Sequence, residues 1–263
     1  MADQPVFDGS RQKVSWANKL IADLKTEIVA FLARDPFPFL LGDDLEAERT
    51  YLFCNVREVV PRHLPLMLGD ALHNLRAALD LLANDLVANC TGKHKIRDAY
   101  FPIYKSSEEF EKQVKKKLKG ASPELIERLR KFQPFSTGDN SLRGLHELDV
   151  GNKHKRIITT VGATLLNPLY IFPRMKPELN SEPRQTTSIR GVTFRHLRVD
   201  PTALGMQKCC GYPSHWFLVP TEKFPATFSF CFGNGEPFPG KDAVATAELL
   251  STKVMEVIER FED

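Results

Sequence analysis

The chain has 263 residues and a formal net charge of +3, with 42% hydrophobic and 26% charged residues, values close to those of an average soluble globular protein. This length fits one large domain or two small ones, and it is enough to bury a substantial core without disulfide or metal staples. No apolar run reaches the ~18 residues that span a bilayer, and "MADQPVFDGSRQKV" lacks the order of a secretion signal. We therefore expect a cytoplasmic protein with no membrane partner.

The first half of the chain predicts two long helices with a strand between them. Residues 11–34 carry apolar side chains at helical spacing, and Pro36 ends the pattern. Residues 48–60, "ERTYLFCNVREVV", alternate and are rich in β-branched and aromatic residues, which predicts a strand. A second helix is expected over about 65–89, with Pro65 in its first turn.

Two short helices are expected next, over 107–118 and 122–132, the second capped by Ser122 with Pro123 in its first position. Another helix begins near residue 140, and Gly151 weakens its end. From 156 to about 232 the sequence changes to short β-type runs separated by Pro, Gly and Asn.

The last pattern, "DAVATAELLSTKVMEVIERF", predicts a strong amphipathic helix. Because this helix follows the β-rich part, we expect an α+β fold in which a helical bundle carries a packed or inserted antiparallel sheet. The predicted parts are a helical bundle with a small β element (1–155), a β-rich region (156–240) and a C-terminal helix that returns to the bundle (241–263).

Cysteine usage argues against a metal ribbon or a thioredoxin-type site. The five Cys are scattered and no C-x-x-C pair occurs, so reduced thiols are expected.

Basic residues gather in three places that are candidates for contact with a phosphate backbone. These are 93–97, the run "KQVKKKLKG" at 112–120 with Lys115 and Lys116, and 152–156. A solvated helix face explains the lysine run as well, and both interpretations stay open.

Polar residues form one stripe on the leucine-rich helix "LGDALHNLRAALDLLANDL" at 68–86. His73, Arg76, Asp80 and Asn84 are spaced i, i+3, i+7 and i+11, so they share a face. This face contains no Lys or Glu, the residues that solvated helix faces favour. Either the stripe is structural, or Arg76 is held by Asp80 and presents its guanidinium to a phosphate or carboxylate.

A second polar stretch, "LRGLHELDVGNKHKR" at 142–156, has similar chemistry. His146 and Asp149 lie at the margin of its Leu face, while His154 is a candidate general acid–base with Lys153 and Arg156 around it. The alternative is a helix end whose Lys and His complement the C-terminal dipole. A metal site is a third option, but the spacing matches neither E-x-x-H nor H-E-x-x-H; its candidate ligands are His73, Asp80, His146, Glu147, Asp149 and His154.

The two stretches resemble a widespread, largely uncharacterised group of bacterial proteins. The shared motifs are G-D-x-L-H-N-L-R-x-A-L-D at 69–80, "FPI" at 101–103, L-x-x-L-x-x-x-[DN]-K-H-[RK] around 145–155, and G-x-P-x-x-G at 235–240. More distantly, the helical part resembles the HEPN (higher eukaryote and prokaryote nucleotide-binding) domains, small bundles that include many toxin and phage-defence ribonucleases. Those enzymes carry an Arg and a His a few residues apart on one helix. Here the nearest Arg upstream of His154 on its segment is Arg143, which lies too far away.

The leading hypothesis is therefore a HEPN-like protein that binds RNA or a nucleotide, with metal-independent RNA cleavage as its enzymatic form and no cofactor. His154 would be the acid–base, Arg76 would hold the phosphate, Asp80 would orient Arg76, and His73 would assist. Nucleic-acid contacts are expected from Asn74, Lys153, Arg156, Lys115 and Lys116. The competing hypotheses are a non-enzymatic interaction or regulatory module, with a homodimer left open, and a metal-dependent hydrolase.

Overall fold

A computed structural model describes residues 7–44, 49–93, 96, 98–135, 140–154, 159–165, 171–173, 197–199, 203–213, 216–218 and 226–262. Within these residues the helices are α1 (Asp8–Leu32), α2 (His63–Thr91), α3 (Ser107–Lys117), α4 (Pro123–Lys131), α5 (Asn140–His154) and α6 (Ala243–Glu259). The strands are β1 (Phe39–Asp44), β2 (Arg49–Val56), β3 (Thr159–Leu165), β4 (Ile171–Pro173), β5 (Leu197–Val199), β6 (Gly205–Pro213), β7 (Trp216–Leu218) and β8 (Ala226–Phe232). The predicted α+β class is confirmed.

The chain divides into two compact units, each built from separated segments. The helical unit comprises residues 1–27, 62–158 and 232–263, and the strand unit comprises residues 28–61 and 159–231. Residues 28–61, which contain β1 and β2, thus group with the later strands.

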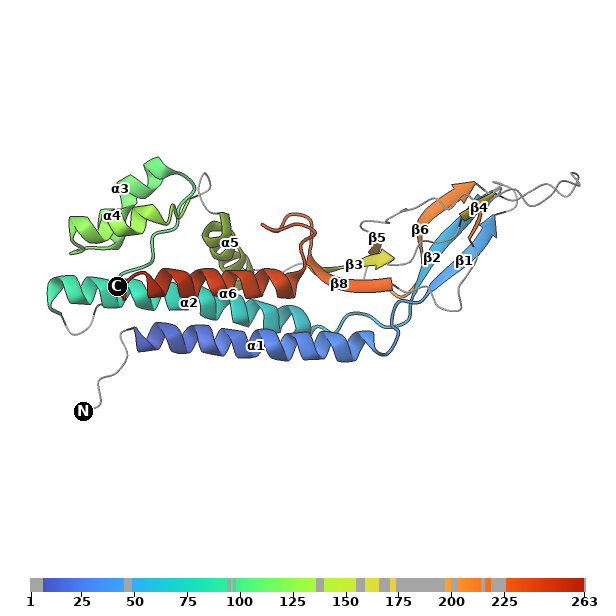
Figure 1. Ribbon diagram of the computed structural model, residues 1–263, viewed down its shortest axis with the longest axis horizontal. Helices are drawn as coiled ribbons and strands as arrows, with labels where there is room; N and C mark the ends of the chain where they lie inside the picture. The colour runs from blue at the N-terminus through green and yellow to red at the C-terminus, as the bar shows by residue number, and fades with distance from the viewer. Residues whose placement is uncertain are drawn as a thin grey trace, which may run out of the picture. The chain divides into compact units, whose positions relative to one another are not determined.

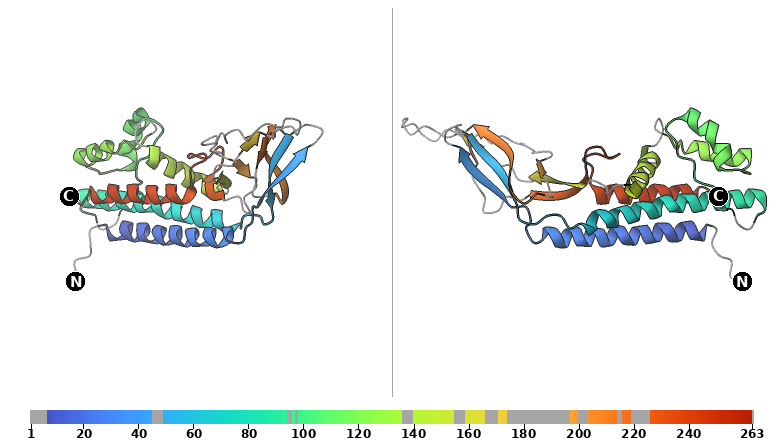
Figure 2. Two further views of the ribbon diagram at one scale, coloured as in Figure 1. Left: turned by 45° about the vertical axis from the view of Figure 1, so that its right-hand side comes forward. Right: turned by 180° about the vertical axis from the view of Figure 1, so that it is seen from behind.

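Three long helices form the body of the helical unit. Figure 1 shows α1, α2 and α6 side by side, and the two views in Figure 2 agree. The predicted leucine face of α2 is confirmed, because all six leucines of that face are buried: Leu68, Leu72, Leu75, Leu79, Leu82 and Leu86. The apolar spacing of α1 likewise buries Val14, Ala17, Ile21 and Leu24. Burial of one face on each helix is what brings the three together.

The C-terminal helix returns to the bundle, as predicted. It packs against α2 and α5, and the Ser251 hydroxyl donates to the Asn18 side-chain oxygen of α1 at 2.5 Å. Asp242 caps the start of α6 by accepting from the Ala245 amide at 2.7 Å.

The shorter helices begin at side-chain caps. Ser106 caps α3 by accepting from the Glu109 amide, and the predicted Ser122 cap of α4 accepts from the Leu125 amide. Helix α5 continues through Gly151 and ends three residues later at His154, although glycine has a low helix propensity. None of the helices in the described ranges is both long and apolar enough to cross a membrane.

The strand unit contains small sheets, in which β2 pairs antiparallel with β1 and β6, β3 with β5, and β4 with β7. One has the order β1-β2-β6, with Phe39 opposite Cys54 and Arg49 opposite Pro213, and a bulge between Leu52 and Phe53. The others have the orders β5-β3-β8 and β4-β7. The strand expected over 48–60 is confirmed as β2 but ends at Val56.

Asp85 on α2 offers a test of the helical unit by pH. It is half-buried, and desolvation raises the pKa of its carboxyl group. A raised folded-state pKa means that the protonated form fits the fold better, so this stabilisation is complete below the unfolded-state pKa and is lost as pH rises through the folded-state pKa. We expect Asp85→Asn to melt at a higher temperature than the wild type at about pH 7, and the difference to vanish below about pH 4. Asp23→Asn, at an exposed ion pair with Lys19, is the control, and a lower melting temperature for Asp85→Asn at neutral pH would contradict the expectation.

Candidate functional site

The polar stripe of α2 is not simply the wet side of an amphipathic helix. Arg76 is only 6% exposed, although it lies on the face that the sequence pattern marks as polar. Its guanidinium donates to Asp80 Oδ1 at 2.6 Å, so the ion pair anticipated from the i, i+4 spacing is present. A buried cation of this kind requires partners on more than one side.

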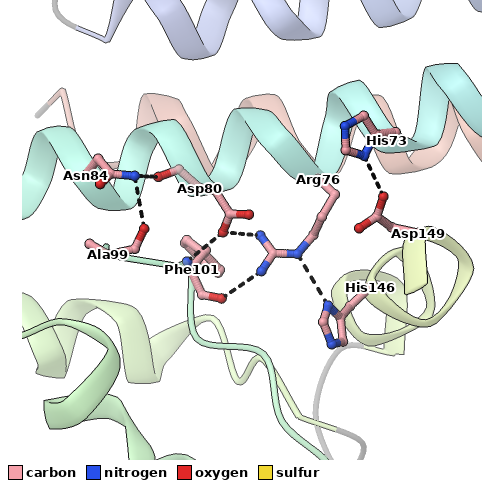
Figure 3. A network of polar contacts seen from close by, with 8 residues as sticks. All are labelled: His73, Arg76, Asp80, Asn84, Ala99, Phe101, His146 and Asp149. Atoms are coloured by element: carbon pink, nitrogen blue, oxygen red, sulfur yellow. Dashed lines mark hydrogen bonds and ion pairs between the residues drawn. The ribbon is translucent and has the colours of Figure 1, made fainter. Parts of the chain in front are cut away.

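The partners of Arg76 come from three segments. Its Nη2 donates to the Phe101 carbonyl at 3.1 Å, and its Nε donates to His146 Nδ1 over a longer 3.4 Å. Asp80 Oδ1 also accepts from the Phe101 amide at 2.9 Å, which closes a ring of contacts among Arg76, Asp80 and the Phe101 backbone. Figure 3 shows this arrangement, with Arg76 between the Phe101 segment and α5.

The same stripe fixes the segment that carries the "FPI" motif. Asn84 donates to the Ala99 carbonyl at 2.9 Å, one helical turn beyond Asp80 (Figure 3). Asp80, Arg76 and Asn84 therefore hold the backbone of residues 99–101 along α2. These bonds satisfy backbone groups that no helix or strand would pair.

The second polar stretch meets the first at α5. His73 Nδ1 lies 2.7 Å from Asp149 Oδ1, and Asp149 is 2% exposed while the His73 side chain is half exposed. In Figure 3, His73 and Arg76 reach toward α5, from which Asp149 and His146 point back. The two polar stretches thus converge where α2 meets α5.

The residues that carry this convergence differ in part from those expected. His146 and Asp149 are the contacts to α2, whereas the sequence hypothesis paired Arg76 with His154. Helix α5 ends at His154, but the side chains of Lys153 and His154 lie outside the described residues, as does Arg156.

Two glycines allow the motif segments to approach closely. A Cβ at Gly69 of α2 would lie 2.4 Å from the Asn152 side-chain oxygen of α5, and a Cβ at Gly144 of α5 would lie 2.2 Å from the Phe238 ring. Both separations are far below van der Waals contact, so these positions accept no side chain without movement of the neighbour. Helix α5 therefore approaches closely both the 69–80 segment of α2 and the 235–240 loop.

A cavity of about 400 Å³, here called the first cavity, opens beside this network. Its walls come from α2, the 100–105 segment, α3 and α5, and the lining residues are Arg76, Asp80, Tyr100, Phe101, Ile103, Tyr104, Lys105, Glu109, Lys117, Arg143, His146, Asp149 and Val150. All of them belong to the helical unit. The volume lies within the range of small-molecule sites.

The first cavity is lined by four cationic side chains and three carboxylates. The Asp80 carboxylate is paired with Arg76, and the Asp149 carboxylate contacts His73. Lys105 and Lys117 form no ion pair with any residue that the structure describes, and the Lys117 ammonium lies 5.1 Å from the Tyr100 ring centroid. These two ammonium groups are therefore available to bind an anionic ligand in the first cavity.

Tyr104 adds a neutral hydroxyl to the wall. Burial and the neighbouring Glu109 carboxylate both raise the pKa of its phenol. The phenol therefore stays protonated at neutral pH and is available as a hydrogen-bond donor.

Several residues expected at a nucleic-acid site lie elsewhere. Asn74 is buried, accepts from Lys13 of α1 at 2.9 Å and donates to the Asp70 carbonyl, so it links α1 to α2. Lys115 and Lys116 lie in the last turn of α3 and do not line the first cavity. Lys117, the next residue, does.

Sequence reasoning did not single out Tyr100, Lys105 or Arg143 as site residues. A signal for the first two existed, because they flank the "FPI" motif. Their significance depended on the contact of that segment with Arg76 and Asp80, which no spacing along the chain reveals.

The candidate metal ligands whose side chains the structure describes do not gather into one centre; the His154 side chain lies outside the described residues. Within the described ranges, no group of three or more His, Cys, Asp or Glu side chains is placed to hold a metal ion. Asp80 accepts a hydrogen bond from Arg76, and Asp149 of α5 contacts His73, one turn earlier on α2.

Comparison of the chain with protein-family models, with curated proteins and with solved structures finds no match.

Proposed function

We propose that the helical unit is a HEPN-like module that binds RNA or a nucleotide through phosphate in the first cavity. The observation that carries the proposal is the pair of ammonium groups on Lys105 and Lys117, which have no carboxylate partner among the described residues and line a cavity of about 400 Å³. Uncompensated cations at a concave surface raise the local concentration of anions.

The remaining walls fit the same class of ligand. Tyr100 is 47% exposed and offers a ring face for stacking of a base, while Arg143 offers a guanidinium for phosphate oxygens. Arg76 takes a different role from the one expected, because three of its N–H groups are directed at Asp80, Phe101 and His146. In this proposal Arg76 positions the wall of the cavity.

The binding proposal is tested with a fluorescent single-stranded RNA oligonucleotide. The double variant Lys105→Ala/Lys117→Ala is expected to bind at least about tenfold more weakly, and the slope of log K against log salt is expected to fall by roughly 1–2, because each lysine that contacts a phosphate releases about one counterion. Anisotropy titrations at several salt concentrations measure both quantities.

The matched control is Lys131→Ala/Lys241→Ala, which makes the same change in net charge at exposed positions outside the cavity. It is expected to retain most of the affinity. Equal losses in the two double variants would show non-specific attraction and would refute the site.

Metal-independent RNA cleavage is the second candidate, and the contact of His73 with Asp149 favours it. A buried carboxylate that accepts from Nδ1 of an imidazole leaves Nε2 with a lone pair that accepts protons. Here Asp149 is 2% exposed, whereas the His73 side chain is half exposed. In the proposed step the RNA 2′-oxygen bonds to phosphorus as its proton passes to His73 Nε2, and the P–O5′ bond breaks as O5′ takes a proton from water.

Cleavage is tested on single-stranded RNA in the presence of a chelator. His73→Gln is expected to lower the cleavage rate by about 10²-fold or more, the usual contribution of an acid–base group, while RNA affinity changes little. His63→Gln is the control, because His63 lies on the same helix and is also exposed but contacts Glu27. Wild-type protein that binds RNA without cutting it would end the cleavage proposal and leave the binding proposal standing.

A further inference from the structure

A second cavity, of about 480 Å³, is lined in part by the same α5 residues as the first. It is lined by Arg143, His146, Glu147, Val150 and Gly151 of α5 and by Gly235, Glu236 and Pro237 of the G-x-P-x-x-G loop. Three of these residues, Arg143, His146 and Val150, also line the first cavity. The two cavities therefore adjoin along one stripe of α5.

The shared stripe carries groups that bind phosphate. Arg143 and His146 are one helical turn apart at i, i+3, and Val150 follows at i+7, so all three share one face. The Arg143 guanidinium is held by Glu147 at 2.8 Å from its Nε. The Arg76 Nε–H donates to His146 Nδ1 over 3.4 Å, which orients the imidazole ring.

The two cavities differ in charge. The first is lined by Lys105 and Lys117, which form no ion pair with a described residue, whereas Glu147 and Glu236 are the acidic residues that line the second. Carboxylates repel phosphate but accept hydrogen bonds from the hydroxyl groups of a sugar and from the amino groups of a base. The second cavity is thus suited to a nucleoside and the shared stripe to a phosphate.

We propose that the ligand spans both cavities as a phosphodiester-linked dinucleotide, with one nucleoside in each cavity and the bridging phosphate at Arg143 and His146. Each cavity lies toward the lower end of the ~300–1,000 Å³ usual for ligand sites, so each accommodates one unit of the ligand. This inference rests on the proposed nucleotide-binding function and specifies the class of its ligand.

Gly151 provides a test that leaves the first cavity intact. It lines only the second of the two cavities, and a Cβ built there meets no heavy atom within 4 Å among the described residues. Gly151→Trp therefore adds a bulky ring on the side of the second cavity without a clash at its Cβ, and tryptophan is a better helix former than glycine. Gly151→Ala is the matched control, because it changes the helix in the same way and adds only a methyl group.

The probes are a mononucleotide and a 2′-deoxy dinucleotide, which lacks the hydroxyl needed for the proposed cleavage step. Calorimetric titration of the wild type and of Gly151→Ala is expected to show tighter binding of the dinucleotide by about tenfold, equivalent to ~1.4 kcal/mol. Gly151→Trp is expected to bind both probes equally, with the affinity for the mononucleotide unchanged.

Each other outcome overturns the inference. Equal affinity for both probes in the wild type, or a dinucleotide preference that survives in Gly151→Trp, shows that the second cavity does not hold part of the ligand, and phosphate binding in the first cavity then stands. Absence of binding by either probe removes the proposed function and this inference together.

Discussion

Replacement of Arg76 by alanine is expected to lower the free energy of unfolding by about 3 kcal/mol, because it removes one partner of a buried ion pair. The loss leaves Asp80 Oδ1 without its cation and the Phe101 carbonyl without its donor. The Asp80 side chain is 27% exposed, so water replaces part of the contact and the cost falls at the lower end of the range for such pairs. For a folding unit of this size, the melting temperature should drop by roughly 6–12 °C.

Two further variants separate the guanidinium from its charge. Arg76→Lys retains the cation but replaces three diverging N–H groups with a single ammonium, and we expect an intermediate loss. Arg130→Ala removes an arginine that pairs with Glu111 and Glu127 at the surface, and exposed pairs contribute less than about 1 kcal/mol. Equal losses in Arg76→Ala and Arg130→Ala would contradict the network seen in the structure.

The Arg76 result also bears on the choice between binding module and purely structural network. Both hypotheses require a loss of stability, since the network holds the 99–101 segment along α2. Only the binding hypothesis requires that Lys105→Ala/Lys117→Ala weaken RNA binding without a change in melting temperature. The two measurements together therefore decide between these hypotheses.

Replacement of Gly144 by alanine is expected to destabilise the protein by about 1–3 kcal/mol, the usual cost of overpacking. The new methyl group would lie 2.2 Å from the Phe238 ring, and Phe238 lies against the buried Phe232 with ring centroids 6.0 Å apart. Phe238 must move, and the loop at 235–240 must move with it. Thermal or denaturant unfolding measures the effect.

The matched control again comes from α5 itself. Gly151→Ala places the same substitution seven residues later, where the Cβ meets no described atom, and we expect it to stabilise the protein by about 0.5–1 kcal/mol through helix propensity alone. The two variants should therefore shift stability in opposite directions. A Gly144→Ala variant as stable as Gly151→Ala would show that Phe238 does not pack on this helix.

The local sequence pattern was sufficient to predict the helices, because apolar residues spaced three and four apart match the period of an α-helix and not that of a strand. The start of α4 followed from Ser122 and Pro123, whose chemistry acts within one turn. The strands were harder to predict. β1 was missed because it is a short run directly after Pro38. β6 lies inside the β-type region expected over 156–232, but its bounds could not be predicted because "GMQKCCGYP" shows no alternation. Both strands are defined by pairing with β2, which is a contact between segments distant in sequence.

The sequence by itself determined that α2 and α5 each carry a polar stripe beside a leucine face, and that Arg76 and Asp80 are spaced to pair. Those properties depend on residues within a few helical turns of one another. Only the tertiary structure decided that Arg76 is buried, that His146 contacts Arg76 and Asp149 contacts His73 between α2 and α5, and that Lys105 and Lys117 line the same cavity. The reason is physical: the burial of a polar side chain and the identity of its partner depend on which helices pack together and at which register, and at Gly69 and Gly144 that register is set by the absence of a side chain.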